Sequence, residues 1–284
     1  MRRRKDGSPR RMGLGLFVLG VLTLLYAPIV LVLVQAFNAD PSLTRWGGAT
    51  TRWFSQAASD PAVTDSLSAS FQIALLATCL SVVIAVSAAL YARRGSSRRR
   101  TVIDTTTYMR IALPEIVSAV ALFVFFRRLD VELGMWTVVA GHVVFTSAYA
   151  TLVIQARLAT MSPTLEAAAA DLGASPRRAF QRVTMPLLMP AIIVAALFAF
   201  SFSFDDVVTS SFLAGTNTQT LPMQILGRVR FTVTPEVNAI GVGVMLVTLA
   251  TLVTALAALA LSGSGRSMVQ RRRTRAQTTV SEAR

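Results

Sequence analysis

The sequence has few residues that could perform covalent chemistry. Its 284 residues include one cysteine, Cys79, and one histidine, His142. A single cysteine excludes an internal disulfide and a cysteine-rich metal site. The sequence also lacks the phosphate-binding pattern G-x-x-x-x-G-K-[ST], the zinc-protease pattern H-E-x-x-H and a nucleophile elbow. We therefore expect no catalytic residue, no metal and no cofactor.

Acidic residues are scarce as well, and basic residues are not. The chain has 14 Asp and Glu against 28 Lys and Arg, which gives a formal net charge of +14. Such an excess can indicate nucleic-acid binding. Here 53% of the residues are hydrophobic and the mean hydropathy is +0.57, which is typical of an integral membrane protein. We therefore expect a protein in contact with membrane lipid and no nucleic-acid partner.

Long apolar runs predict an all-α integral membrane protein. A helix needs roughly 20 residues to cross the hydrocarbon core. The third of the predicted spans is interrupted by Arg110, Pro114 and Glu115, and Pro114 predicts a kink there. We predict a membrane domain over residues 12–265, between basic tails at 1–11 and 266–284. The six predicted spans are 12–37, 66–92, 105–126, 134–156, 187–213 and 237–262.

The distribution of basic residues predicts the orientation. With six spans, 21 of the 28 Lys and Arg residues fall on one side and six on the other, while Arg110 lies within the third span. Cytoplasmic segments carry the excess of Lys and Arg. We therefore predict that both termini and the polar segment 162–190 are cytoplasmic.

That polar segment contains residues that are typical of helix starts and helix stops. Ser162 followed by a proline is typical of a helix start, and Gly173 suits a left-handed helix stop. Ser175 and Pro176 then repeat the start signal. The segment therefore predicts a short helix, a tight glycine turn and a second helix.

The spacing within this segment resembles the EAA loop of binding-protein-dependent ABC importers. That motif reads E-A-A, three residues, Gly, nine residues and I-x-L-P. Here Ala167 stands where the motif has Glu, and Glu166 comes one residue early, which is about 100° around a helix. The resemblance implies a coupling helix that docks on an ATP-hydrolysing subunit. Its implied coupling residues are Glu166, Ala167, Ala168, Asp171, Gly173 and Pro186.

Other stretches resemble the second permease subunit of spermidine/putrescine importers. They are LPEIV at 113–117, FDDVV at 204–208, TLP at 220–222 and TPEVNA at 234–239. The resemblance implies the type I ABC importer permease fold in a bacterial inner membrane. It also implies as partners a second permease subunit, a dimer of ATP-binding subunits and an extracytoplasmic solute-binding protein. The solute would be a small molecule, a polyamine such as spermidine or putrescine.

Carboxylates within apolar spans need a partner or a role, because each costs about 2.5–3.5 kcal/mol at a helix centre. Asp205, Asp206 and Glu115 are the candidate residues of the substrate pathway. On a continuous fifth helix the two aspartates would point about 100° apart, so that one could face the pathway while the other pairs with another helix.

Each of these candidates has a structural alternative. The aspartates could only neutralise Arg228 or Arg230, and Glu115 could pair with Arg110 across the kink. For His142 we expect a hydrogen-bonded packing role rather than proton relay, since no neighbouring acid is evident in the sequence.

The sequence leaves two classes of function. The first is the permease subunit of an ATP-driven importer, in which a separate subunit hydrolyses ATP. The alternative is a secondary transporter driven by an ion gradient, with Asp205, Asp206 or Glu115 as the coupling acid.

Overall fold

The computed structural model describes residues 9–162 and 164–257, and these residues are mostly helical, with no strand among them. The predicted tails therefore lie largely outside the described residues. The elements are α1 (Pro9–Gln35), α2 (Arg52–Ser59), α3 (Pro61–Arg94), α4 (Ser97–Ala112), α5 (Glu115–Arg128), α6 (Met135–Ala159), α7 (Thr164–Asp171), α8 (Pro176–Ala179), the π-helix η1 (Phe180–Thr184), α9 (Met185–Phe204), α10 (Val208–Leu213) and α11 (Leu221–Phe231), followed by an apolar helix at Pro235–Ala257.

Five of the described helices are long and apolar enough to cross a membrane, which confirms the all-α membrane fold class. They are Gly13–Gln35, Pro61–Arg94, Met135–Ala159, Pro176–Phe204 and Pro235–Ala257. A sixth span results if α4 and α5 are taken together as one broken span.

The third predicted span is sharply bent rather than straight. The axes of α4 and α5 differ by 104°. Leu113, the residue before Pro114, is extended, with φ −72° and ψ 130°. A residue that precedes proline is disfavoured in the α-helical conformation. The predicted break at Pro114 is thus confirmed, and it is larger than a kink.

The fifth predicted span also differs from the structure. A continuous helix runs over Pro176–Phe204 and ends there, and α10 is a separate short helix. The prediction over 187–213 relied on hydropathy, which does not detect a helix break inside an apolar stretch. The break is stabilised locally, because the Asp206 side chain accepts the backbone N–H of Ser210 at 2.8 Å and so competes with the helical hydrogen bonds.

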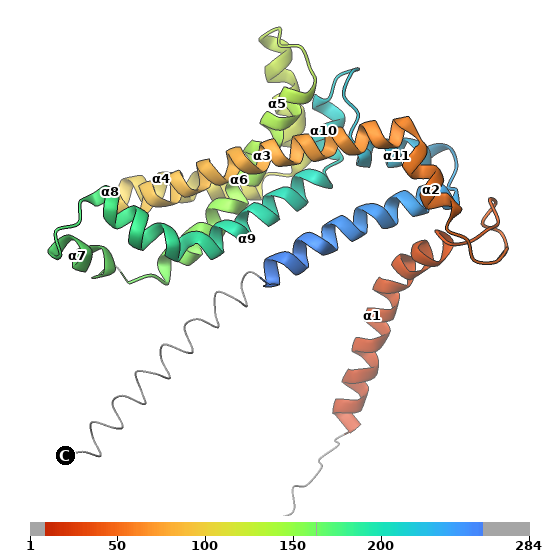
Figure 1. Cartoon of the computed structure of the whole chain (residues 1–284), viewed down its shortest axis with the longest axis horizontal. Helices are drawn as coiled ribbons and strands as arrows, with labels where there is room; N and C mark the ends of the chain where they lie inside the picture. Colours follow the sequence, from red (N-terminus) through yellow and green to blue (C-terminus); the bar gives the residue numbers. More distant parts are fainter. Residues whose placement is uncertain (1–8, 163, 258–284) are drawn as a thin grey trace, which may run out of the picture. The chain divides into compact units, whose positions relative to one another are not determined.

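The described chain forms two units, which we describe separately. Of the described residues, the first unit comprises 9–64 and 225–245, and the second comprises 65–162, 164–224 and 246–257. In the second unit α6 packs along α9, as Figure 1 shows, and α10 packs against α5 and α6.

Small residues line the packed helix faces of the second unit. A buried cluster from α3, α6 and α9 contains Ala85, Ala89, Ala150, Ala191 and Ala195. Small side chains let membrane helices approach closely, and packing then replaces the hydrophobic effect as the attractive force. A buried hydrogen bond of 2.7 Å between the hydroxyls of Ser81 and Thr146 joins α3 to α6.

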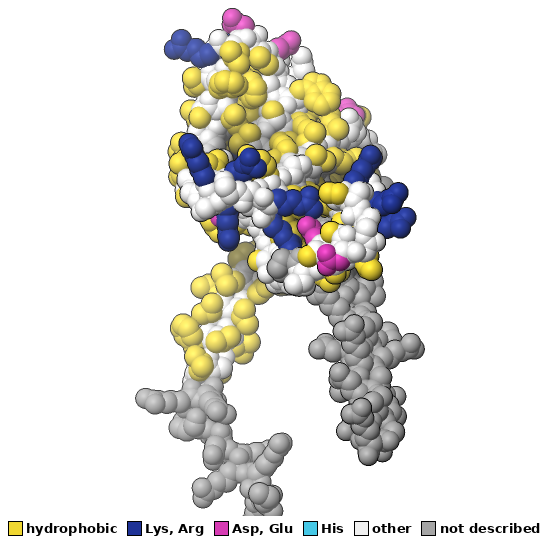
Figure 2. All heavy atoms as spheres, turned by 90° about the vertical axis from the view of Figure 1, so that its left-hand side faces the viewer, with side chains coloured by type: hydrophobic (Ala, Val, Ile, Leu, Met, Phe, Trp, Pro, Cys, Tyr) yellow, Lys and Arg dark blue, Asp and Glu magenta, His cyan; other side chains and the backbone are white. Residues whose placement is uncertain are grey.

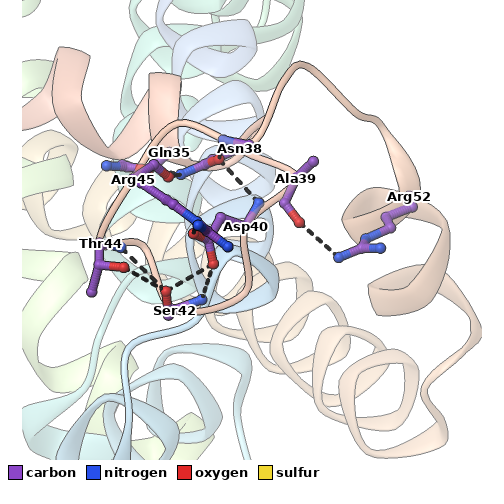
Figure 3. Close-up of polar contacts among 9 residues, drawn as sticks. Gln35, Asn38, Ala39, Asp40, Ser42, Thr44, Arg45 and Arg52 are labelled. Atoms are coloured by element: carbon purple, nitrogen blue, oxygen red, sulfur yellow. Dashed lines mark hydrogen bonds and ion pairs between the residues drawn. The ribbon is translucent and has the colours of Figure 1, made fainter.

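In the first unit, one buried side chain organises the loop between α1 and α2. The Asn38 amide nitrogen donates to Gln35 Oε1 and to the Arg45 carbonyl oxygen, each at 2.8 Å. Its amide oxygen accepts the backbone N–H groups of Asp40 and Gly47 at 3.1 and 2.9 Å. Figure 3 shows Asn38 beside Gln35 and Asp40. Because Asn38 is fully buried, its hydrogen bonds hold this loop in one conformation.

Candidate functional site

Asp205 and Asp206 lie in the link between α9 and α10, not on a continuous helix. Asp205 is the C-cap of α9, with φ −97° and ψ 1°, and α10 starts only at Val208. The expectation that the two carboxylates project about 100° apart from one helix is therefore wrong. The helix break places both at the point where two helix ends meet.

Asp206 is held by partners from two other parts of the second unit. Its Oδ1 lies 3.2 Å from His142 Nε2 on α6 and accepts the Ser210 N–H of α10. The Asp206 side chain is only 5% exposed and the His142 side chain 2%. A buried carboxylate that accepts hydrogen bonds from both an imidazole and a backbone N–H avoids the cost of an unpaired buried charge.

The packing role expected for His142 is observed, but the expectation of no neighbouring acid is wrong. Besides Asp206, His142 contacts the hydroxyls of Ser203 at 2.6 Å and Ser210 at 3.1 Å. The neighbouring residue on α6, Gly141, permits this arrangement, because a Cβ there would come within 2.6 Å of Leu213. The close approach of α6 and α10 is what brings the ring to Asp206.

Glu115, at the start of α5, joins the same group of acids. Its carboxyl is within hydrogen-bonding reach of the Asp206 carboxyl, and it accepts the Thr209 hydroxyl at 3.4 Å. No ion pair with Arg110 is formed. The Arg110 guanidinium instead lies 5.0 Å from the centre of the Phe145 ring, with its Nε and Nη1 atoms buried and without hydrogen-bond partners among the described residues.

The three carboxylates line one cavity of about 480 Å³. Its walls also include aromatic side chains that contact one another. Phe202 lies 5.8 Å from Phe145 and 6.2 Å from Phe198 between ring centres. The volume falls in the range of about 300–1,000 Å³ that is typical of small-molecule sites. Carboxylates beside aromatic faces suit a cationic ligand, since both attract positive charge.

The two aspartates differ in what they can offer to a ligand. Asp206 is engaged by His142 and Ser210, whereas Asp205 is exposed and lines the cavity. Of the pair, Asp205 therefore has the more available carboxylate.

Arg228, suggested by the sequence as a neutralising partner for the aspartates, forms other ion pairs. Within the first unit its guanidinium contacts Asp60, and its Nη1 donates to Glu236 Oε1 at 2.8 Å. The hydrogen bond that Arg228 donates to Asp60 holds the pKa of the Asp60 carboxyl below its ordinary value.

The polar segment forms the predicted helix, turn and helix. Gly173 has φ +79°, its N–H donates to the Ala170 carbonyl and the Ala174 N–H donates to the Ala169 carbonyl, each at 2.9 Å. This is the hydrogen-bond pattern of a Schellman stop. The second helix starts at Pro176 and continues without interruption into α9.

Most of the residues singled out in this segment are exposed. They are Ala167, Ala168, Asp171, Gly173 and Pro186. Figure 2 looks onto the end of the second unit where α7 and α8 lie in Figure 1, and it shows Lys and Arg side chains gathered around a few acidic ones. Exposed arginines of this segment are Arg177, Arg178 and Arg182.

Glu166 differs from these residues because it faces other parts of its own chain. Its Oε1 accepts the Thr184 hydroxyl at 2.6 Å and Arg94 Nη2 at 3.2 Å. The Thr184 hydroxyl, followed by Arg94, holds the pKa of the Glu166 carboxyl below its ordinary value. The contact therefore stabilises the loop above the ordinary pKa of a glutamate, and the stabilisation is lost as the pH falls through the lowered value.

Sequence reasoning missed several members of the site. It did not find the His142 to Asp206 contact, the serine partners or the aromatic wall. The only available signal was the presence of a histidine and three acids in apolar segments. Their separation along the chain, 64 residues between His142 and Asp206, hides the contact.

The chain resembles known membrane components of transport systems. Residues 77–273 match the family described as Binding-protein-dependent transport system inner membrane component. The chain is 34% identical over 225 residues to the Putrescine transport system permease protein PotI of Escherichia coli (strain K12), covering 77% of this chain and 80% of that protein. It is 31% identical over 237 residues to the Spermidine/putrescine transport system permease protein PotC of Haemophilus influenzae, covering 84% and 92%.

Solved structures share the fold. A chain of a bacterial ABC transporter involved in the import of the acidic polysaccharide alginate matches with a TM-score of 0.67 at 16% identity, covering 90% of this chain and 96% of that one. A chain of an amino acid ABC transporter matches with a TM-score of 0.53 at 17% identity, covering 78% and 99%.

We predict that His142→Leu destabilises the protein in detergent. The substitution leaves a buried carboxylate without its imidazole partner, and breaking such a pair typically costs about 3–5 kcal/mol. Thermal unfolding measures the loss. Adding Asp206→Asn to His142→Leu should recover part of it, because the uncompensated charge is removed. A His142→Leu variant as stable as the unsubstituted chain would contradict the assigned pairing.

Proposed function

This chain belongs to the family of binding-protein-dependent transport system inner membrane components, and we propose that the solute it carries is a small polyamine. It is an inner-membrane permease subunit of an ABC importer, in which ATP is hydrolysed by a partner subunit. The proposal concerns the solute, the residues that contact it and the arrangement of the subunits.

The observation that supports a polyamine is the gathering of Glu115, Asp205 and Asp206 around one cavity with an aromatic wall. Both curated relatives named above carry putrescine or spermidine in their names. A polyamine has two or more ammonium groups joined by apolar methylene chains. Carboxylates would bind the former and aromatic side chains the latter.

Within this site the roles of the acids differ. Asp205, exposed in the cavity, is the direct contact for an ammonium group. Asp206 is held by His142, keeps the ends of α9 and α10 in place and orients Glu115. The cavity lies where α9 ends, so a movement of α9 would change the distance between these acids and the solute.

The partners follow from the same family. A second permease subunit, a dimer of ATP-binding subunits and an extracytoplasmic solute-binding protein would complete the importer. Segment 162–190, with α7 exposed, is the part that docks on an ATP-binding subunit. Its exposed face carries Leu172, which is 89% exposed, beside Ala168 and Asp171. The basic residues at both termini and around α7 support a cytoplasmic location for all three.

We predict the orientation of the chain from its charge. A reporter fused after Arg94 or Arg178 should report the cytoplasm, and one inserted near Trp46 or Thr218 should report the outside. Paired phosphatase and fluorescent-protein fusions measure this. An extracytoplasmic signal after Arg178 would contradict both the topology and the docking role of α7.

We predict that Gly173→Val weakens binding of the ATP-binding subunit while membrane insertion persists. Gly173 has φ +79°, where a β-branched residue is strained although a Cβ would meet no atom within 4 Å. Gly173→Asn is the matched control, since asparagine tolerates this conformation. Co-purification should fall for valine and not for asparagine. Equal recovery for the two variants would contradict the role of the glycine stop.

We predict that Asp205→Asn lowers polyamine uptake by roughly tenfold or more, because one charge-assisted contact contributes about 1.5–3 kcal/mol. The amide retains the size of the side chain, so the complex should still assemble. Asp206→Asn should instead reduce the amount of assembled complex. Uptake of radiolabelled putrescine, normalised to co-purified complex, measures both. Full uptake by Asp205→Asn would exclude the direct contact, and uptake that needs no ATP would favour the ion-driven alternative.

A further inference from the structure

The side chain of Glu166 connects α7 to two other helices of the second unit. Its Oε1 accepts hydrogen bonds from Thr184 at 2.6 Å and from Arg94 at 3.2 Å, and the Glu166 side chain is 29% exposed. α7 itself has no buried residue among those described. The Glu166 carboxylate is thus a strong, charge-assisted attachment of a helix that otherwise has little packing.

Thr184 occupies a special place in the helix that it joins to α7. It is the last residue of the π-helix η1, and α9 follows directly. A π-turn inside an α-helix departs from the regular hydrogen-bond pattern, and such turns occur frequently at functional sites. From Thr184 the helix continues to Phe204, next to Asp205. One end of this helix therefore contacts α7, and its other end leads directly into Asp205 and Asp206 of the cavity.

We propose that Glu166 and Thr184 are positioning residues that transmit a displacement of α7 to α9 and thereby to the acid cluster. The proposal rests on the proposed docking of α7 on an ATP-binding subunit. When that subunit moves α7, the Glu166 to Thr184 hydrogen bond makes α9 follow. Without it, α7 is joined to α9 by the Gly173 turn and by packing against α8 and η1 that buries no α7 side chain, which would let α7 move separately. Arg94 provides a second attachment, to the end of α3.

This role differs from direct docking by Glu166, which the EAA resemblance implies. Glu166 is partly exposed, so substituting it does not separate the two roles. Thr184 does, because it is 0% exposed and no partner subunit can touch it. An effect of Thr184 on coupling must pass through the permease itself.

The first experiment measures coupling in the complete importer, reconstituted in liposomes with its binding protein. Thr184→Val keeps the shape of the side chain and removes the hydroxyl. We expect it to lower the solute imported per ATP hydrolysed by roughly fivefold or more, the lower end of a typical coupling free energy. Co-purification of the ATP-binding subunits should be unchanged. Thr184→Ser, which retains the donor, should behave like the unsubstituted chain.

Thr151→Val is the matched control. Thr151 is also buried, at 3% exposure, and among the described residues its hydroxyl donates only to the Ser147 carbonyl within α6. We expect normal coupling from this variant. An equal loss of coupling in Thr151→Val and Thr184→Val would overturn the proposal, because the effect would then be general to buried threonines. A normal ratio in Thr184→Val would overturn it as well.

The second experiment does not depend on the identity of the solute. Ser201 lines the cavity, and Ser201→Cys in a Cys79→Ser background introduces a single thiol there. Its labelling rate is measured in the complex with and without ATP and vanadate. We expect trapping to change the rate, and Thr184→Val to abolish that change. A change that persists in Thr184→Val would overturn the proposal.

The two experiments also separate this inference from the proposed function. If trapping changes the labelling but putrescine is not imported, the proposed solute is wrong and the connection stands. If Thr184→Val does not assemble, Thr184→Ala, which also removes the buried hydroxyl, replaces it in both assays, with Thr184→Ser as its conservative partner. Normal coupling in Thr184→Ala would then overturn the proposal.

Discussion

The burial of one carboxylate determines much of the second unit. Asp206 lies in an apolar region where an unpaired charge would be strongly destabilising. Its partners come from two different elements, His142 on α6 and the Ser210 N–H on α10. Satisfying this one group requires α9 to end at Phe204, α10 to start as a new helix and α6 to approach α10 at Gly141.

The same arrangement explains why a site exists at this place. On a continuous fifth helix, Asp205 and Asp206 would lie on separate faces of the helix. The break instead brings Glu115 of α5 and the two aspartates to one cavity beside aromatic side chains. The bend of 104° between α4 and α5 contributes, because it brings the start of α5, with Glu115, to α10. Two local interruptions of helices, one at Pro114 and one at Asp205, thus create the polar site inside an apolar fold.

The long helix from Pro176 to Phe204 relates this site to the surface of the permease. Its start belongs to the exposed helix-turn-helix, and its end carries Asp205. A rigid element that joins two distant regions is a physical basis for coupling between them. The hydrogen bond from Thr184 to Glu166 adds α7 to that element. In the EAA motif the glutamate stands at the position of Ala167, whereas here the acidic residue is Glu166, one position earlier. At this position Glu166 faces inward, while Ala167 and Ala168 are exposed.

The sequence by itself determined the fold class, the break at Pro114, the Gly173 stop and the likeness to importer permeases. These features are local: hydropathy, proline sterics and helix caps act over a few residues. Only the tertiary structure decided which charges meet. Arg228 pairs with Asp60, 168 positions away, and Asp206 pairs with His142, 64 positions away. Such pairs depend on how helices pack and where they end, and a helix break inside an apolar run leaves no hydropathy signal.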